Sequence, residues 1–422
     1  MQEDVNALVH RIDGGRMREL LVDFANLQSA NDRALGAAEW YAGLLRASGA
    51  AEASVRREGL ISPAVVAGFP GTSRAPALEF VGYLASPGTM RRKAFSVSGQ
   101  VYGRGVGSTA AGLIAAAEAA RVLALQGPLP GGGLLFLARP MGDPIEAAAD
   151  FERLTTQGVV GRAVVITSGP SRLLPIVGLG SCMFQAVFTA PGDLGSASGP
   201  QSTVIDSAHL FCSSLRRRQR ALQGTCDSLA GPEAIVVGRI GGGEHFDLTP
   251  ASSWVQGVWR YGPSRPEQSV RAELDRMARK AAAACGARVQ VTMRVGRPPF
   301  HLDRSLPLVQ GLQAGYRTAW GTDLPVGGCC VPTDVPLFLA HGVPAVCHGP
   351  RQAPVRAEGG EECVAIEDLI RLAEVYVRLS VSILRETSQG AGGPIRLDPP
   401  GSATDLLSRA PHVSLAGQGR TQ

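Results

Sequence analysis

Hydrophobic residues recur at helical spacing through the first fifty positions of the chain. They come every three or four residues, in three successive groups that begin at Val5, Met17 and Leu35. This spacing places them on one face of a helix. We therefore expect three amphipathic helices before residue 50, the last of which begins near a cap at Asn31 or Asp32.

Between about residues 60 and 170, short apolar runs alternate with one long Ala-rich segment. The runs lie at 77–85, 132–140 and 163–170, and the Ala-rich segment extends from Thr109 to Leu125. Such runs are typical of strands buried on both faces, and the helices between them act as crossovers. The pattern predicts a mostly parallel or mixed sheet that is covered by helices on both faces.

The middle of the chain has a different order of elements. Its pattern predicts a strand, a helix, two strands, a helix and a strand, at 180–192, 202–222, 234–240, 252–262, 266–286 and 288–295. This is the order of a ferredoxin-like unit. After it, α/β alternation returns, with helices expected at 306–320, 335–340 and 366–384 and a strand at 344–349.

The simplest assembly is an α/β domain built from both ends of the chain, with a second domain inserted in the middle. Residues 1–173 and 301–388 would form the first domain, a mixed-sheet α/β sandwich. Residues 174–300 would form a ferredoxin-like (βαββαβ) lid or dimerisation domain. Residues 389–422, rich in Gly, Ser and Pro, are expected to form a flexible tail.

Composition narrows the class of protein. With 422 residues, 45% of them hydrophobic and 18% charged, the chain can bury a large core and is not a disordered or fibrous protein. A net charge of +5 and 5% aromatic residues argue against a nucleic-acid partner. The polar, acidic start and the lack of a long uninterrupted apolar stretch predict a soluble cytoplasmic protein without a membrane partner. Eight cysteines without a C-x-x-C pair indicate reduced thiols.

Several short motifs occur along the chain in an order and spacing that indicate a protein family. They are Y-G-R-G at 102–105 before a Gly/Ala-rich helix, V-G-R-I-G-G-G from 237, R-P-P-F at 297–300, Thr333-Asp334, and G-V-P-A-V-x-x-G-P at 342–350. With the inserted unit, they resemble the co-catalytic zinc amidohydrolases, which include acetylornithine deacetylase, succinyl-diaminopimelate desuccinylase, aminoacylase and glutamate carboxypeptidase. The resemblance covers about residues 5–385. It implies a homodimer through the inserted domain and two zinc ions bound at the ends of the sheet strands by histidines and carboxylates.

The residues that would bind those ions are not present at the matching positions. Tyr83 and Ala85 stand at the first histidine ligand and at the aspartate that orients it, and Ser108 or Thr109 stands at the bridging aspartate. Pro140 and Met141 stand near the paired glutamates, Gly169 at a further carboxylate ligand, and a site near Glu358 at the last histidine. Ser196 stands at the histidine of the inserted domain that polarises the substrate carbonyl in the family. Imidazole and carboxylate ligands are what hold zinc and lower the pKa of its water. The sequence therefore predicts a divergent member without the dinuclear zinc site and with no cofactor.

Other positions of the expected cleft keep polar side chains. Arg260 matches an arginine that grips the substrate carboxylate in the family, although it could equally be a surface residue of an edge strand. Asp247 stands where the family has an asparagine that binds substrate. His245, in the same Gly-rich turn, is a candidate acid or base or an ordinary loop histidine.

Three more candidates lie where strands end. Ser108 with Thr109 would form an anion cradle at a helix N-terminus, or a simple helix cap. Asp334 would contact substrate or cap the helix that follows it. His348, after a probable strand, would contact ligand. We take Ser108, His348, His245 and Tyr83 as candidate catalytic residues, and Arg260, Asp247, Thr109, Ser196, Asp334 and Glu358 as candidate substrate-binding residues.

Three functions remain open at this point. The first is a repurposed member that binds a small amino-acid-derived or peptide-like molecule and acts on it without metal, in a specialised biosynthetic pathway. The second is a non-catalytic dimeric scaffold or partner protein. The third is a metal-dependent hydrolase with a rebuilt shell of Asp143, Glu358, Asp334 and His348, a set whose carboxylates could hold a hard cation.

Overall fold

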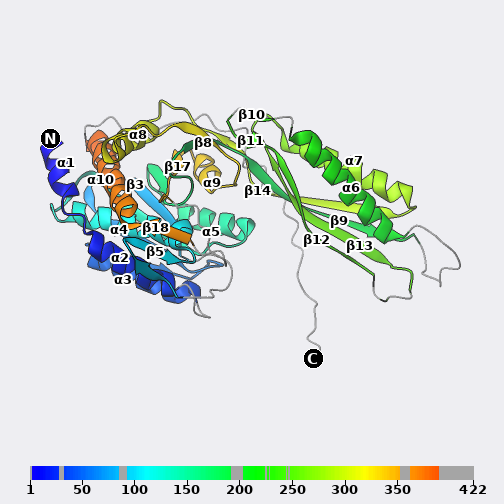
Figure 1. Cartoon of the computed structure of the whole chain (residues 1–422), viewed down its shortest axis with the longest axis horizontal. Coiled ribbons are helices and arrows are strands. Elements are labelled where there is room, and N and C mark those ends of the chain that lie inside the picture. Colours follow the sequence, from blue (N-terminus) through cyan, green and yellow to red (C-terminus); the bar gives the residue numbers. More distant parts are fainter. Residues whose placement is uncertain are drawn as a thin grey trace.

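The chain folds into two bodies that lie side by side (Figure 1). This computed structural model describes residues 2–27, 33–84, 93–191, 203–223, 226–227, 229–243, 245, 248–351 and 362–388. Each body has its own cluster of buried hydrophobic side chains. The larger body contains both ends of the described chain, and the smaller one is formed by its middle.

The larger body is built on a six-stranded sheet with the strand order β1-β2-β6-β3-β7-β17. The strands are β1 (Glu52–Arg56), β2 (Ala64–Phe69), β3 (Gly71–Tyr83), β6 (Leu129–Arg139), β7 (Ala163–Ile166) and β17 (Ala345–Cys347). Strands β6, β3, β7 and β17 are parallel, whereas β2 is antiparallel to both β1 and β6. The carboxyl ends of four neighbouring strands therefore lie at one edge, where open α/β sheets bind ligands.

Helices pack on both faces of this sheet. On one face lie α3 (Arg33–Ala47), α4 (Ala111–Ala124), α8 (Pro307–Trp320) and α10 (Ile366–Ser388). On the other face lie α5 (Pro144–Thr156) and α9 (Val335–Leu339), whose Phe151 and Phe338 rings meet at 4.5 Å. Side chains alternate between these two faces along each strand, so the last residues of a strand point in opposite directions.

The Ala-rich helix lies close to the sheet because glycines remove side chains at the contact. A Cβ at Gly112 would lie 1.8 Å from the carbonyl oxygen of Thr167, and one at Gly82 would lie 2.3 Å from Leu113. Together with a preceding π-helical turn, η1 (Val106–Ala110), α4 is long and apolar enough to span a membrane, but 89% of that stretch is buried within the protein. It is thus the core helix of the larger body.

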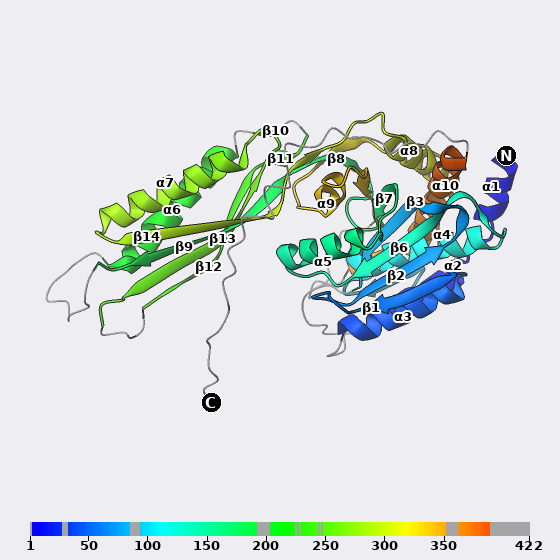
Figure 2. The same ribbon diagram turned by 180° about the vertical axis from the view of Figure 1, so that it is seen from behind.

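The smaller body is an antiparallel four-stranded sheet with two helices. The strand order is β12-β13-β9-β14, formed by β9 (Gly180–Thr189), β12 (Ala234–Gly242), β13 (Ser252–Tyr261) and β14 (Arg288–Arg297). Both α6 (Val204–Leu222) and α7 (Glu267–Ala284) lie on the same side of it (Figure 2). A capping box at Thr203 and Asp206 starts α6 where its apolar face begins.

Short elements complete the described fold. Three-stranded sheets are formed by β15 (Phe300–His301), β8 (Leu174–Gly178) and β16 (Val326–Cys329), and by β18 (Glu362–Ala365), β5 (Gln100–Gly103) and β4 (Phe95–Val97). Strands β10 (Cys226–Asp227) and β11 (Gly231–Pro232) pair with each other, and α1 (Gln2–Val9) and α2 (Gly14–Leu27) begin the chain. Because β8 leads directly into β9, it carries the chain from the larger body into the smaller one.

The predicted α/β fold with a mixed sheet is confirmed. Helix α5 and the three-stranded sheets were not among the expected elements. Strand β3 is also longer than predicted at its N-terminal end, because it begins at Gly71, before the apolar run at 77–85. The expected cap at Asn31 or Asp32 and the tail at 389–422 lie outside the described residues.

Candidate functional site

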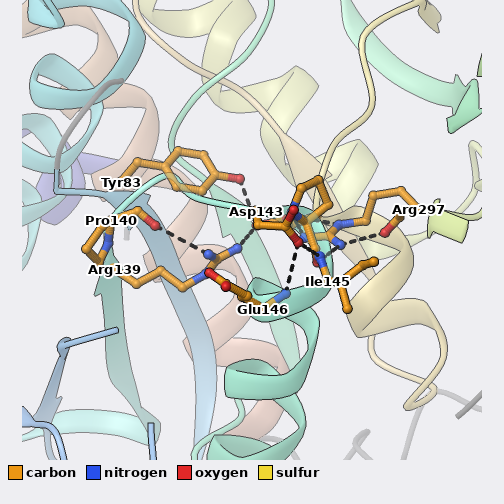
Figure 3. A network of polar contacts seen from close by, with 10 residues as sticks. Tyr83, Arg139, Pro140, Asp143, Ile145, Glu146 and Arg297 are labelled. Atoms are coloured by element: carbon orange, nitrogen blue, oxygen red, sulfur yellow. Dashed lines mark hydrogen bonds and ion pairs between the residues drawn. The ribbon is translucent and has the colours of Figure 1, made fainter. Parts of the chain in front are cut away.

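Four charged and polar side chains meet at the carboxyl edge of the central sheet. We call them the Asp334 cluster: Tyr83 ends β3, Arg139 ends β6, Arg297 ends β14, and Asp334 directly precedes α9. Figure 3 shows Tyr83, Arg139 and Arg297 converging beside the first turn of α5. The chain brings these residues together because Tyr83 and Arg139 are register partners on adjacent parallel strands.

Asp334 is the acceptor at the centre of this cluster. Its Oδ2 accepts hydrogen bonds from the Tyr83 hydroxyl at 2.8 Å and from Arg139 Nη2 at 2.5 Å. Its Oδ1 accepts from Arg297 Nε at 2.8 Å and from Arg297 Nη2 at 2.6 Å. The side chain of Asp334 therefore does not cap α9, which was one of the two sequence expectations for it.

The electrostatics of the cluster fix its protonation states. Burial would raise the pKa of Asp334, but Arg139 and Arg297 outweigh burial and lower this pKa to about 2. Burial and the neighbouring Asp334 carboxylate hold the pKa of Tyr83 well above its usual value. At neutral pH the cluster is thus one carboxylate, one neutral phenol and two guanidinium cations, with an excess of one positive charge.

Arg297 also joins the two bodies. Its Nη1 donates to the carbonyl oxygens of Pro144 and Gly296, each at 2.6 Å. Because Arg297 belongs to the smaller body and Pro144 and Asp334 to the larger one, a single guanidinium spans the boundary between them. The register of β14 shifts just before Arg297, and such an irregularity re-aims a side chain.

The turn at Ser108, where an anion cradle is predicted, binds a carboxylate of the protein itself. Glu362 Oε2 accepts from the backbone N–H groups of Gly107 at 2.7 Å and Ser108 at 2.6 Å, and Glu362 Oε1 accepts from the Ser108 hydroxyl at 2.7 Å. Thr109 is buried, and its hydroxyl donates instead to the carbonyl oxygen of Gly105 at 2.8 Å. The first turn of η1 is therefore built to hold a carboxylate.

His348 follows the end of β17 but does not reach the Asp334 cluster. It is 1% exposed, and its ring packs edge-on against Tyr316 and Tyr376, with centroids 5.9 and 6.1 Å away. These tyrosines belong to α8 and α10, on the face of the sheet opposite to α9. The structure thus separates His348 from Tyr83, two residues that the sequence analysis grouped as candidate catalytic residues.

The remaining candidates lie elsewhere. Arg260, half-buried on β13, extends its Nη1 to within 3.5 Å of the carbonyl oxygen of Cys330 in the larger body. His245 is exposed beyond the end of β12. The expected sites at Asp247, Ser196 and Glu358 lie outside the described residues.

The described side chains at the strand ends do not form a donor set that fits a zinc pair. Among the described residues, no group of three or more His, Cys, Asp or Glu side chains is placed to hold a metal ion. Of the rebuilt shell considered above, Asp143 caps α5 through the N–H groups of Ile145 and Glu146. Asp334 is saturated by arginines and Tyr83, and His348 lies on the other face. The described members of that shell therefore do not converge.

Sequence reasoning missed Arg139, Arg297 and Glu362. Arg139 carried a usable signal, because a charged residue that ends a long apolar run needs a buried partner. Arg297 stood in the R-P-P-F motif, and Glu362 follows the site near Glu358 that was compared with a zinc ligand of the family. Their partners, however, lie 195, 37 and 254 residues away along the chain, and spacing alone does not pair residues at such separations.

Comparisons with known proteins agree on the fold. The family described as "Peptidase family M20/M25/M40" matches residues 87–382. Among solved structures, a tripeptidase from Staphylococcus aureus has a TM-score of 0.71 and 16% identity, over 89% of this chain and 99% of that one. The di-peptidase Dug1p from Saccharomyces cerevisiae has a TM-score of 0.70 and 9% identity, over 91% and 99%. Human carnosine dipeptidase 1 has a TM-score of 0.67 and 13% identity, over 90% and 99%. No curated protein sequence matches the chain.

Proposed function

Because the chain belongs to peptidase family M20/M25/M40, we propose that it uses the architecture of these peptidases to bind a small amino-acid-derived or peptide-like molecule, without a dinuclear zinc centre. The ligand would bind at the carboxyl ends of the strands through its carboxylate or amide groups. Any reaction there would use side chains of the protein alone.

The observation that carries this proposal is the saturation of Asp334. A carboxylate has about four lone-pair positions, and here Tyr83, Arg139 and Arg297 donate four hydrogen bonds to them. Such a carboxylate has no free lone pair for a metal ion. The two guanidinium groups supply positive charge at the strand ends, which favours an anionic ligand group.

The state of the Tyr83 hydroxyl favours binding over nucleophilic catalysis. This hydroxyl donates a hydrogen bond to Asp334. An activated nucleophile needs a neighbouring base that accepts its proton at neutral pH. With its pKa lowered to about 2, Asp334 is a poor base for Tyr83.

Arg260 is the residue that we assign to the ligand carboxylate. Its Nε is buried without a hydrogen-bond partner among the described residues, and its single contact across to Cys330 is long at 3.5 Å. A guanidinium with an unused donor next to the boundary between the two bodies is suited to bind a carboxylate.

Metal content tests the first half of the proposal. The protein is purified without chelator, dialysed against excess zinc and then against metal-free buffer, and zinc per chain is measured by elemental analysis. We expect a stoichiometry near zero and no zinc-dependent hydrolysis of N-acetylated amino acids or dipeptides. Two tightly held zinc ions per chain would overturn the proposal and restore an ordinary amidohydrolase.

Ligand binding tests the second half. A panel of N-acetylated amino acids and dipeptides is screened by thermal shift and calorimetry against the wild type and Arg260→Gln. Arg239→Gln is the matched control, because this guanidinium lies 5.2 Å from the Trp254 ring within the smaller body. We expect binding to weaken at least about tenfold in Arg260→Gln and to be unchanged in Arg239→Gln. Equal weakening, or no binding by the wild type, would contradict the assignment.

A second candidate function is a dimeric scaffold formed through the smaller body. Its edge strand β12 exposes Val236 and Ile240 by 51% and 56%, whereas the opposite edge strand, β14, exposes Arg288 and Arg294. An exposed edge strand with apolar side chains can pair with a strand of another chain, whereas charged side chains on an edge strand oppose such pairing. We expect Val236→Lys with Ile240→Lys to convert a dimer to a monomer in sedimentation experiments. A wild type that sediments as a monomer would exclude this function.

A further inference from the structure

A second group of polar side chains surrounds His348, separate from the Asp334 cluster. We call it the His348 enclosure: Tyr316 and Trp320 of α8, His348 and Arg351 after β17, and Tyr376 of α10. The Tyr316 and Trp320 rings stack at 5.6 Å, and the Arg351 guanidinium lies 3.6 Å from the centre of the Trp320 ring. The enclosure lies at the same strand edge as the Asp334 cluster but on the opposite face of the sheet.

The enclosure contains buried nitrogens without partners. Both ring nitrogens of His348, Nε1 of Trp320 and Nε of Arg351 are buried and make no hydrogen bond within the described part of the chain. Leaving a buried donor or acceptor without a partner destabilises the folded protein. Four such atoms on three neighbouring side chains are unusual, because buried polar groups in folded proteins are nearly always satisfied by protein, water or an ion.

We propose that the His348 enclosure is a binding site for a small oxyanion, of the carboxylate or phosphate type. The unused groups of Trp320 and Arg351 can only donate hydrogen bonds, and a neutral imidazole donates from one of its two nitrogens. Among these four atoms donors therefore outnumber acceptors by three to one, and such a set is complementary to an oxyanion. The aromatic rings of Tyr316 and Tyr376 shield the site from water and so strengthen these bonds.

The charges around the enclosure favour an anion. The Arg351 guanidinium has one side-chain hydrogen-bond partner among the described residues, the neutral Tyr316 hydroxyl. A second guanidinium, that of Arg371, lies 5.0 Å from the Trp320 ring and is paired with Glu367. Burial raises the pKa of the nearby Asp368, whereas Arg351 and Arg371 lower it. Within the described part of the chain, no carboxylate accepts a hydrogen bond from Arg351, whose side-chain partner is the Tyr316 hydroxyl.

The state of the histidine agrees with this assignment. Burial and then Arg351 lower the pKa of His348 to about 4, so its ring is neutral near pH 7. A bound anion would counteract both Arg351 and burial, and it would raise this pKa. The site is independent of the proposed cleft around Arg260, and either could exist without the other.

The test uses sodium acetate and sodium phosphate as probes, with sodium chloride to match ionic strength. The imidazole nitrogens of the seven histidines are observed by NMR after labelling with ¹⁵N-histidine, and His348→Phe identifies the His348 signals by their loss. Phenylalanine matches the ring and its aromatic neighbours, so this variant is expected to fold. Trp320→Phe removes the indole donor alone, and the His341 signal is the internal control, because His341 pairs with Glu152 on the outside of the protein.

We expect one of the two probes to shift the His348 signals saturably, to raise the apparent His348 pKa and to leave His341 unchanged. Affinity, measured by isothermal titration calorimetry because His348→Phe lacks the reporting signals, should weaken at least about tenfold in Trp320→Phe and vanish in His348→Phe. Preference for acetate would indicate an organic carboxylate ligand, and preference for phosphate a phosphorylated one. Shifts with neither probe, or binding that survives in His348→Phe, would overturn the proposal and indicate that water satisfies these nitrogens.

Discussion

The carboxylate of Asp334 accepts four hydrogen bonds from three side chains at the strand edge. It neutralises one of two buried guanidinium groups and aligns the Tyr83 hydroxyl, the Arg139 side chain and the Arg297 fork. A buried charge is tolerated only while it is paired and hydrogen-bonded. The cluster is therefore sensitive to loss of its single anion and much less sensitive to loss of one donor.

We expect Asp334→Asn to destabilise the protein by about 3 to 5 kcal/mol, because it leaves Arg139 and Arg297 buried without a counter-charge. Tyr83→Phe, the matched variant, removes one neutral donor and should cost roughly 1 to 3 kcal/mol. Urea unfolding of both variants measures the difference. Equal losses in the two variants would show that the ion pairs contribute little.

Glu79 provides a test of pH dependence at a single residue. It is fully buried in β3, and burial, opposed by a hydrogen bond from the Gly161 N–H, raises its pKa from 4.5 to about 8. Between these two values the folded protein keeps a proton that the unfolded chain has released. Stability from this group is thus fully present below pH 4.5 and is lost as the pH rises through 8.

We expect Glu79→Gln to remove this alkaline loss. The stability of the variant relative to the wild type should be higher near pH 9 than near pH 5, because only the wild type loses the contribution of the protonated Glu79 as the pH rises. The effect is on the order of a few kcal/mol over the whole range. Thermal unfolding measured every half pH unit would reveal it, and parallel curves for the two proteins would contradict it.

At the scale of elements, packing determines how close α4 lies to the sheet. A Cβ at Gly112 would fall 1.8 Å from the Thr167 carbonyl oxygen, whereas one at Gly43, within α3, would meet nothing within 4 Å. Alanine in place of helical glycine stabilises by about 0.5 to 1 kcal/mol where there is room. We therefore expect Gly43→Ala to stabilise the protein and Gly112→Ala to destabilise it in urea unfolding. The same sign for both would contradict this account.

Elements with a strong apolar period were predictable from the sequence, and others were not. Helices α6, α7 and α10 each carry a long apolar face and lie where the periodicity places them. Strand β4 has all three residues exposed, so no alternation identifies it. Of the site, Tyr83, Ser108 and Asp334 stood out at strand ends or beside motifs. Their partners Arg139 and Glu362 are set by tertiary packing, which local spacing does not encode.

At the scale of the whole molecule, Arg297 fixes the two bodies to each other. Its guanidinium donates to Asp334 through two nitrogens and to the carbonyl oxygens of Pro144 and Gly296 through the third. It is 4% exposed and ends a strand of the smaller body, whereas Asp334 and Pro144 belong to the larger one. A lysine keeps the charge but cannot make this fork of hydrogen bonds.

We expect Arg297→Lys to loosen the joint while both cores remain folded. Small-angle scattering should then show a larger and broader distribution of particle dimensions, with circular dichroism unchanged. Arg294→Lys is the matched control, because Arg294 lies on the same strand with its side chain exposed. Scattering curves for Arg297→Lys that superimpose on the wild type would place the rigidity of the joint elsewhere, in the strand pairs of β8 with β15 and β16.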